Sequence, residues 1–480
     1  MQNPDYATLA LYIDGEWIED TKDKGEVLNP ANGEVLGLHP MATAEQIDCA
    51  LASSLKGFEI WRKTPHAERK AIMHKAAGLL REQATDVARH MTLELGKPLA
   101  DSVAEVENCA MLLEWCSNAA EESVDRTLDG MPGFIDRTVR KEPIGPVAAF
   151  APWNFPASLA TRKIASALAV GCSVVVKPAE ETPASFMAVV QALDKAGLPA
   201  GVINLLLGDP ALISKRLIES PVIRKVAFTG STPVGEQLAA MAGKHAKPCV
   251  MELGGHAPVL VFDDANIEKA LDLSVTTKSR NAGQVCISPT RFYVQDSAHA
   301  AFAKGFAEKF AALRVGDGLD SDTQMGPLAH ARRVPAVDAL VKDAVEKGAT
   351  LLTGGEPLDR EGYFYAPTVL ADVPDNARIM KEEPFGPVAI INKFNTYDDA
   401  ISKANSTDFA LASYLFTGSQ ETADKASIDL DSGKVGINGF PVVFLDSPLG
   451  GRRQSGYGSE GGYEGLDAYR MVKFVSQSEI

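Results

Sequence analysis

One stretch of the chain, RNAGQVCISPTRF at residues 280–292, places a single cysteine, Cys286, between small flexible residues and a proline. A cysteine thiolate is a strong nucleophile that can form a covalent intermediate with an electrophilic carbon. The same side chain can instead pack as a small buried hydrophobe, or form a redox pair with a second cysteine. The residue types in this stretch alone leave these three interpretations open.

The other cysteines favour neither a metal site nor a disulfide framework. The chain has six cysteines, Cys49, Cys109, Cys116, Cys172, Cys249 and Cys286. They form no CxxC pair and no zinc-like cluster, so we expect no metal site. Because disulfides are rare in a reducing cytosol, we interpret all but Cys286 as small buried hydrophobic residues.

The charge of the chain excludes some classes of partner. Its 480 residues include 63 acidic and 47 basic side chains, which gives a formal net charge of −16. A surface of this sign repels polyanions, so we expect no nucleic-acid partner and no anionic membrane partner. An anionic substrate would therefore need a local basic site.

The apolar segments of the chain are too short for membrane insertion. Residues 1–15 lack a basic segment followed by an apolar one, so we expect no secretory signal. The most apolar stretch, residues 164–176, contains Gly171 and is shorter than the roughly 20 residues that span a bilayer. We therefore expect a cytoplasmic protein.

The elements that must position Cys286 follow helix and strand patterns. Alternating residues through 11–20, around Asp14-Gly15, are typical of a hairpin. Residues 43–118 have helical periodicity with a break at 95–98. The chain then alternates between predicted strands at 145–152, 173–178, 201–208 and 225–230 and predicted helices at 158–170 and 183–197. This alternation predicts a mostly parallel sheet with helices on both faces.

A second run of the same kind begins at about residue 251. It predicts strands over 257–262 and 291–295 and helices over 267–280, 298–313 and 331–347. The length agrees with two or three domains at roughly 100–200 residues each. Residues 133–145 are predicted to be extended and 467–477 to form a last strand, which would pair with 133–143 or with another subunit.

Several short motifs resemble those of one enzyme family. They are PWNFP (152–156), KPAEETP (177–183), FTGSTPVG (228–235), MELGG (251–255), NAGQVC (281–286) and EEPFGP (382–387). In this order they resemble the aldehyde dehydrogenase superfamily, and the similarity runs from YIDGEW to the last strand. The chain is most similar to the branch that oxidises succinate and α-ketoglutarate semialdehydes, although Ser279 stands where a Phe is usual.

The resemblance implies a catalytic role for three side chains. In this family a thiolate, here Cys286, adds to the aldehyde to form a thiohemiacetal that can lose hydride. Glu252 resembles the general base that activates water to hydrolyse the resulting thioester. Asn154 resembles the donor that stabilises the oxyanion, together with the backbone N–H of Cys286. Without the resemblance, Glu252 would be interpreted as a solvated carboxylate and Asn154 as a turn residue.

The resemblance also separates subclasses of the family. Branches that transfer the acyl group to coenzyme A lack a glutamate at the position of Glu252. The resemblance therefore implies a hydrolytic enzyme that releases a carboxylic acid.

The expected cofactor site does not use the common dinucleotide fingerprint, since no GxGxxG follows the predicted strands. Instead, two glycines enclose the start of a helix whose amides can hold a phosphate. The residues that the resemblance assigns to the cofactor are Trp153, Lys177, Glu180, Gly230, Ser231, Gly235, Glu383 and Phe385. A carboxylate at Glu180 would bind ribose hydroxyls and repel a 2′-phosphate, so we expect NAD, with NADP possible. In isolation, Lys177 and Glu180 would be a surface ion pair.

Two arginines indicate the class of aldehyde. Arg162 lies eight residues after Asn154, and Arg280 lies six residues before Cys286. In the semialdehyde branch, arginines at the matching positions hold the distal carboxylate, to which a guanidinium donates in a bidentate fork. The resemblance therefore implies a small ω-carboxy semialdehyde such as succinate or α-ketoglutarate semialdehyde.

The loop GFPVVFLD at 439–446 does not fit this assignment simply. In succinate semialdehyde enzymes the loop usually supplies a small hydroxyl side chain to the carboxylate, whereas here it is apolar. We expect Phe440 and Phe444 to contact substrate, which leaves an aromatic or apolar aldehyde as the alternative. Ordinary loop packing would also explain the pattern.

The resemblance implies an α/β fold of two Rossmann-type parallel-sheet domains with a small β extension. We expect an NAD-binding domain from residues 1–121 and 144–251, and a catalytic domain from 252–441. Residues 122–143 and 442–480 would form an oligomerisation segment. The family forms dimers or tetramers, and exposed strand edges favour pairing with a partner, so we expect a homodimer or homotetramer.

Overall fold

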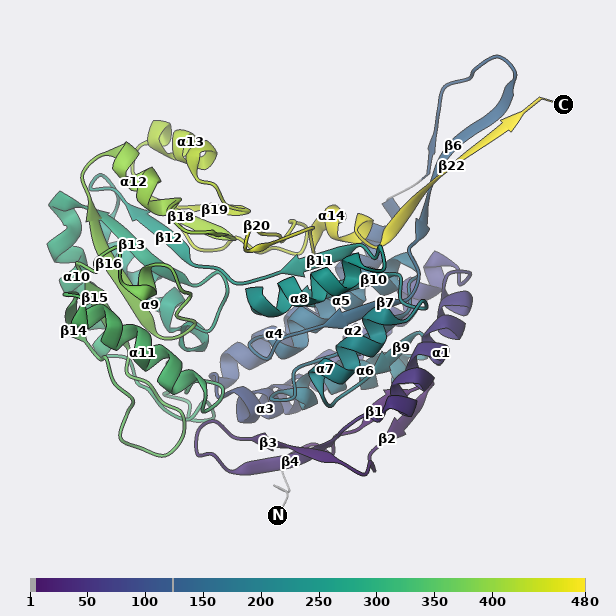
Figure 1. Cartoon of the computed structure of the whole chain (residues 1–480), viewed down its shortest axis with the longest axis horizontal. Helices are drawn as coiled ribbons and strands as arrows, with labels where there is room; N and C mark the ends of the chain where they lie inside the picture. Colours follow the sequence, from purple (N-terminus) through teal and green to yellow (C-terminus); the bar gives the residue numbers. More distant parts are fainter. Residues whose placement is uncertain (1–5, 123–124, 480) are drawn as a thin grey trace.

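Two sheets, each mostly parallel, form the two halves of the molecule (Figure 1). The computed structural model describes residues 6–122 and 125–479. The eight strands of the first sheet, in spatial order, are β2 (Glu16–Ile18), β1 (Leu11–Ile13), β9 (Ile203–Leu205), β8 (Val174–Lys177), β7 (Val147–Phe150), β10 (Lys225–Thr229), β11 (Cys249–Glu252) and β21 (Gly456–Tyr457). The seven strands of the second are β14 (Thr350–Thr353), β15 (Thr368–Ala371), β16 (Val388–Phe394), β13 (Pro289–Gln295), β12 (Ala257–Val261), β18 (Ala412–Phe416) and β19 (Lys434–Ile437).

Helices cover both faces of the first sheet because its central strands are apolar on both sides. In β7, Val147 and Ala149 pack into one hydrophobic cluster, whereas Ala148 and Phe150 pack into another. The helices of the first cluster are α2 (His66–Glu82), α3 (Ala84–Leu95), α4 (Leu99–Glu122), α5 (Pro156–Val170) and α6 (Pro183–Ala196). The helices of the second are α1 (Ala44–Trp61), α7 (Pro210–Glu219) and α8 (Thr232–Gly243). Strands buried on both faces are typical of parallel sheets.

The second sheet is covered in the same way. Val259 and Val261 of β12 pack with the helices on one face, and Leu260 packs with those on the other. The helices on the face of Val259 and Val261 are α9 (Ile267–Ser279) and α10 (Asp296–Ala311). The helices on the face of Leu260 are α11 (Arg333–Glu346), α12 (Tyr397–Ala404) and α13 (Gln420–Asp429). The predicted α/β class with two parallel-sheet units is confirmed.

A β arm projects from the body of the molecule and carries the C-terminal end (Figure 1). The last strand, β22 (Arg470–Ser478), pairs antiparallel with β6 (Phe134–Pro143), which also pairs with β5 (Arg126–Thr127). Of the two expected partners for the last strand, the structure thus shows residues 133–143. Just before β22, α14 (Gly462–Asp467) packs on α4 and α5, while β20 (Arg452–Arg453) pairs with β17 (Phe409–Ala410).

The N-terminal region differs in detail from its prediction. The break at 95–98 is present between α3 and α4, but the helical stretch is also interrupted at 62–65 and at Gln83. A hairpin of β3 (Lys24–Leu28) and β4 (Val35–Pro40) was not predicted, because few of its residues are buried in an alternating pattern. No helix within the described residues is both long enough and apolar enough to cross a membrane.

Replacing Trp61 is expected to destabilise the first-sheet half. Trp61 is fully buried, and its indole N–H donates to the carbonyl of Leu168 at 2.9 Å. Removing a buried indole leaves a cavity and removes one of the hydrogen bonds to that carbonyl, so Trp61→Ala should lower the free energy of unfolding by about 3–5 kcal/mol. Urea denaturation followed by circular dichroism measures this loss. The neighbouring Ile60 is half-exposed, so Ile60→Ala is the control, and an equal effect of the two variants would contradict this description of the core.

Candidate active site

The residues predicted to do chemistry converge between the two sheets. Asn154 follows β7 and Glu252 ends β11, both at the carboxyl edge of the first sheet. Cys286 lies between the short helix η1 (Arg280–Gly283) and β13 of the second sheet. Ligands of parallel sheets bind beyond the carboxyl ends of the strands, so this position agrees with a functional site.

The loop before Cys286 has an unusual backbone. Asn281, Ala282 and Gly283 all have positive φ angles, of 49°, 52° and 71°. A Cβ atom at Gly283 would lie 2.2 Å from the carbonyl oxygen of Gly386, so only glycine fits there. Non-glycine residues in this conformation cost roughly 1–2 kcal/mol each, and the surrounding contacts must offset that cost.

Gln284 supplies part of that support. Its Nε2 donates to the carbonyl of Asn281 at 3.1 Å, and its Oε1 accepts the backbone N–H of Ala329 at 2.9 Å. On the other side of Cys286, the Tyr414 hydroxyl donates to the carbonyl of Ile287 at 2.8 Å. The loop that carries the thiol is therefore held from both of its ends.

Asn154 contacts this loop directly. Its Nδ2 donates to the carbonyl of Gln284 at 3.0 Å, and Asn281 Nδ2 donates to the carbonyl of Asn154 at 3.0 Å. A carboxamide NH₂ carries two protons, so one remains for another acceptor beside Cys286. Among the described residues the buried Oδ1 of Asn154 has no hydrogen-bond partner.

The Cys286 thiol is influenced by two carboxylates, the buried Glu252 and the partly buried Glu383. Burial, followed by the charges of Glu383 and Glu252, raises the pKa of the thiol to about 12. Burial also raises the pKa of Glu383 to about 7, although its Oε1 accepts the backbone N–H of Gly255 at 3.0 Å. These effects favour the neutral thiol over the thiolate.

Glu252 belongs to a buried charged network that the motifs did not reveal. Burial, followed by the charge of Glu460, raises its pKa well above the usual value, against the opposing effect of Lys163. Lys163 Nζ lies 2.6 Å from Glu460 Oε1, and both side chains are fully buried. In the described chain, neither Glu252 Oε1 nor Glu460 Oε2 has a hydrogen-bond partner. A raised pKa favours a group that accepts a proton near neutral pH.

A cavity of about 340 Å³ lies beside the thiol. Cys286, Arg162 and Arg280 all line it, together with Val443 and apolar side chains that include Phe155. Arg162 is 5% exposed, and its Nη1 has no hydrogen-bond partner among the described residues. The guanidinium of Arg280 lies 5.4 Å from the centre of the Phe155 ring. The cavity therefore combines a nucleophile with two cations.

The structure does not bring Phe440 and Phe444 to this cavity. The Phe440 ring packs in the core, 4.8 Å from the Tyr414 ring and 5.4 Å from that of Phe416. It lines a second cavity of about 550 Å³, which shares Arg280 and Val443 with the first. Phe444 is 53% exposed and lines neither cavity. Neither ring therefore lines the cavity that contains Cys286, although Phe440 lines the adjoining one.

The residues expected at the adenosine end lie beyond the carboxyl ends of central strands in the first sheet. Lys177 ends β8 and forms an ion pair with Glu180. Ser231 is the N-cap of α8, and its hydroxyl does not bond the helix amides. A Cβ at Gly235 would lie 2.2 Å from Leu253 Cδ2, so the glycine lets α8 pack closely against the Leu253 side chain. These residues fit a dinucleotide phosphate, because the first amides of a helix lack intrahelical partners.

The residues expected at the nicotinamide end form an aromatic cluster. The Trp153 ring packs edge-on against Phe385 at 5.4 Å and against His330 at 5.3 Å. Arg333 donates to the carbonyls of Pro384 at 2.6 Å and Phe385 at 3.2 Å. His330 and Arg333 were not predicted, because they belong to none of the motifs.

Comparisons with known proteins identify the family of the chain. A model described as the aldehyde dehydrogenase family matches residues 17–475. A 4-(hydroxymethyl)benzenesulfonate dehydrogenase of Comamonas testosteroni is 45% identical over 471 residues, which cover 98% of each chain. A succinate-semialdehyde dehydrogenase [NADP(+)] of Escherichia coli is 39% identical over 464 residues, covering 96% of each. The crystal structure of succinate-semialdehyde dehydrogenase from Burkholderia pseudomallei has a TM-score of 0.96 at 37% identity and covers 100% of both chains.

The alkylation rate of Cys286 should depend steeply on pH. Only the thiolate reacts, and below a pKa of about 12 the thiolate fraction rises about tenfold per pH unit. In the cofactor-free protein, labelling by iodoacetamide should therefore accelerate continuously from pH 7 to pH 10, as measured by mass spectrometry of the peptide. Glu383→Gln removes one of the charges that raise the pKa and should speed the reaction at each pH. A plateau near pH 9 in the unaltered protein would contradict the raised pKa.

Proposed function

Because the chain belongs to the aldehyde dehydrogenase family, and is thus an NAD(P)-dependent oxidoreductase, we propose that it oxidises a small ω-carboxy semialdehyde. Succinate and α-ketoglutarate semialdehydes are the proposed substrates, and the product is the carboxylic acid. One observation carries this proposal: Arg162 and Arg280 line the same cavity as Cys286. The unpaired Nη1 of the buried Arg162 needs an anionic or polar partner, because an unsatisfied buried charge is costly.

In the proposed mechanism, Cys286 adds to the aldehyde carbon. The thiol gives its proton to solvent water, and the carbonyl oxygen becomes an oxyanion bound by the Cys286 N–H and by the remaining Nδ2 proton of Asn154. Loss of hydride from the same carbon leaves the thioester on Cys286. The bound nicotinamide supplies the hydride acceptor. Glu252 then takes a proton from water, which attacks the thioester and releases the acid and the thiol. The buried Lys163–Glu460 pair adjusts how strongly Glu252 holds that proton.

We propose NAD as the preferred cofactor. Its adenosine ribose would contact Lys177 and Glu180, where the carboxylate accepts hydroxyl hydrogen bonds and repels a 2′-phosphate. Ser231 and the α8 amides would bind the diphosphate, with Gly230 and Gly235 allowing close approach. Trp153, Glu383 and Phe385 would surround the nicotinamide end. Leu212 of α7 and Val234 of α8, both exposed, offer apolar contact for the adenine.

An aromatic aldehyde that carries a sulfonate is a second candidate. It is supported by the 45% identity to the hydroxymethylbenzenesulfonate dehydrogenase and by apolar lining residues such as Phe155 and Val443. A sulfonate is an anion that the same two arginines could bind. A neutral apolar aldehyde would leave the Arg162 charge uncompensated, so we do not propose one.

We also propose that the chain is a cytoplasmic homo-oligomer, assembled through the segments 122–143 and 442–480. The β22 strand supports this because it exposes Met471, Val472 and Phe474, with Val472 at 68%. An exposed apolar strand edge favours pairing with another copy. We likewise propose a cofactor domain (1–121 and 144–251) and a catalytic domain (252–441), because each range contains most of one of the two large sheets.

Replacing Arg162 should separate acidic from neutral aldehydes. Removing one hydrogen bond to a charged group costs about 1.5–3 kcal/mol, which lowers kcat/KM roughly 10- to 150-fold. Arg162→Ala should show this loss with succinate semialdehyde and little loss with propionaldehyde, measured as NADH formation. The panel also includes 4-formylbenzenesulfonate, which tests the second candidate. An equal loss with neutral aldehydes, or a more than tenfold preference of the unaltered enzyme for them, would contradict the anion assignment.

Replacing Glu252 should expose the two steps of the reaction. Glu252→Gln cannot accept the proton from water, so thioester hydrolysis should slow more than the first hydride transfer. Stopped-flow absorbance should then show a burst approaching one NADH per subunit, followed by slow turnover. Cys286→Ala is the control and should show no burst. A first turnover as slow as the later ones would mean that Glu252 acts on Cys286 instead.

A further inference from the structure

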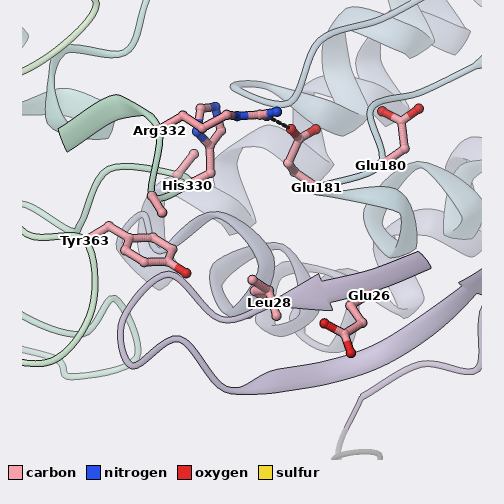
Figure 2. Close-up of a pocket in the computed structure, with 9 residues that line it drawn as sticks. Glu26, Leu28, Glu180, Glu181, His330, Arg332 and Tyr363 are labelled. Atoms are coloured by element: carbon pink, nitrogen blue, oxygen red, sulfur yellow. Dashed lines mark hydrogen bonds and ion pairs between the residues drawn. The ribbon is translucent and has the colours of Figure 1, made fainter. Parts of the chain in front are cut away.

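A pocket of about 290 Å³ adjoins the proposed ribose site (Figure 2). Four separate segments line it: β3 with Glu26, the loop after β8 with Glu180 and Glu181, the loop before α11 with His330 and Arg332, and the loop between β14 and β15 with Tyr363. The first two segments belong to the first-sheet half of the chain, and the other two come from the second-sheet half. The pocket therefore lies where the two halves meet.

One ion pair crosses this pocket. Arg332 Nη2 lies 2.7 Å from Glu181 Oε1, and Figure 2 shows the arginine reaching toward Glu181, with Glu180 beyond it. The Arg332 side chain is 76% exposed and that of Glu181 is 26% exposed. Ion pairs as exposed as this contribute little to stability, so stability does not account for the contact.

His330 and Arg333, on either side of Arg332 in the chain, hold the backbone from which its side chain extends. His330 packs against the Trp153 ring, and Arg333 bonds the carbonyls of Pro384 and Phe385. Both contacts are with residues of the proposed nicotinamide end, although His330 also lines the pocket, and Arg332 extends across the pocket toward Glu181. The loop thus presents one guanidinium toward the proposed ribose end.

The Arg332 guanidinium is the group in this pocket that is best suited to bind an added phosphate. Three carboxylates, Glu26, Glu180 and Glu181, line the pocket, and of the residues that line it in the described chain only Arg332 has a permanent positive charge. The nearby Lys177 is already paired with Glu180. A 2′-phosphate, which carries about −1.5 to −2 charges, therefore meets no uncommitted cation here.

We propose that Glu181 is a second determinant of selectivity for NAD, because it holds Arg332 and so denies that guanidinium to the 2′-phosphate of NADP. This inference rests on the proposed function, in which Lys177 and Glu180 hold the adenosine ribose. Glu180 acts directly on the ribose, whereas Glu181 is a positioning residue that acts through Arg332. Guanidinium groups bind phosphates in a bidentate fork, so a released Arg332 would be an effective phosphate ligand.

Binding of two cofactor fragments tests this without any turnover. Isothermal titration calorimetry at constant low ionic strength compares adenosine 2′,5′-bisphosphate with adenosine 5′-monophosphate, which differ by the 2′-phosphate. In Glu181→Gln the dissociation constant of the bisphosphate should fall at least about tenfold, and that of the monophosphate should change less than about threefold. The NADP to NAD ratio of kcat/KM should rise in parallel, mainly through KM for NADP.

Two further variants separate Arg332 from general electrostatics. In Glu181→Gln/Arg332→Ala the bisphosphate should bind as weakly as it does to the unaltered protein. Glu26→Gln removes the same charge from the same pocket but leaves the Glu181–Arg332 pair intact, so its effect should stay below about threefold. Gains that survive the loss of Arg332, or that Glu26→Gln reproduces, would overturn the proposal.

Glu180→Gln distinguishes failure of this inference from failure of the proposed function. If Glu180 contacts the ribose, this variant should itself bind the bisphosphate more tightly than the unaltered protein. No change in Glu180→Gln would contradict the ribose assignment, whatever Glu181→Gln does. A gain in Glu180→Gln with none in Glu181→Gln would overturn the role of Glu181 alone.

Discussion

The hydrogen bond from Asn154 Nδ2 to the carbonyl of Gln284 joins the two halves of the molecule at the point where the thiol lies. Asn154 belongs to the first-sheet half and Gln284 to the second. The accepting carbonyl, that of Gln284, lies two residues before Cys286 in the chain. The loop needs such a contact because Asn281 and Ala282 have backbone conformations that are unfavourable for their residue types. Gln284 continues the connection to Ala329, next to the loop of His330 and Arg332. The position of the nucleophile and the proposed cofactor contacts from the second half thus depend on one set of polar contacts.

Several of the unsatisfied buried polar atoms in the described chain belong to residues of the proposed site or to residues that contact it. Buried side-chain atoms are paired in the great majority of cases, so these exceptions call for an explanation. The unpaired buried atoms concerned are Asn154 Oδ1, Arg162 Nη1, Glu252 Oε1 and Arg333 Nε. Each belongs to a residue that lies in the proposed substrate or cofactor region or contacts its residues. A protein that is stable with such groups unpaired is arranged for ligands that complete them, and their cost is offset in the cores of the two sheets.

Much of the fold could be predicted from the sequence, because strands buried on both faces have short, mostly apolar sequences such as VAAF and VVVK. The break near Gly96 was predicted for a similar local reason, since its φ of 84° is readily adopted by glycine. The β3–β4 hairpin and the Lys163–Glu460 pair were missed for the opposite reason. Residues 163 and 460 are separated by 297 positions, and no local pattern encodes their contact. The apolar loop at 439–446 shows a further limit, because composition alone did not tell that Phe440 faces the core and Phe444 the solvent.

The charges near Cys286 couple substrate recognition to the proposed base. The chain has a net charge of −16, so the proposed site for an anionic aldehyde needs local cations, and Arg162 is one of those that line the cavity. The same guanidinium is one of the cations that lower the pKa of Glu252, against burial and Glu460. A substrate carboxylate bound to Arg162 would neutralise that cation and allow the pKa of Glu252 to rise further. Glu252 would then hold a proton from water more strongly once an acidic substrate is in place. An aldehyde without the distal anion would leave Glu252 a weaker base, so recognition of the far end of the substrate and chemistry at the near end depend on the same arginine.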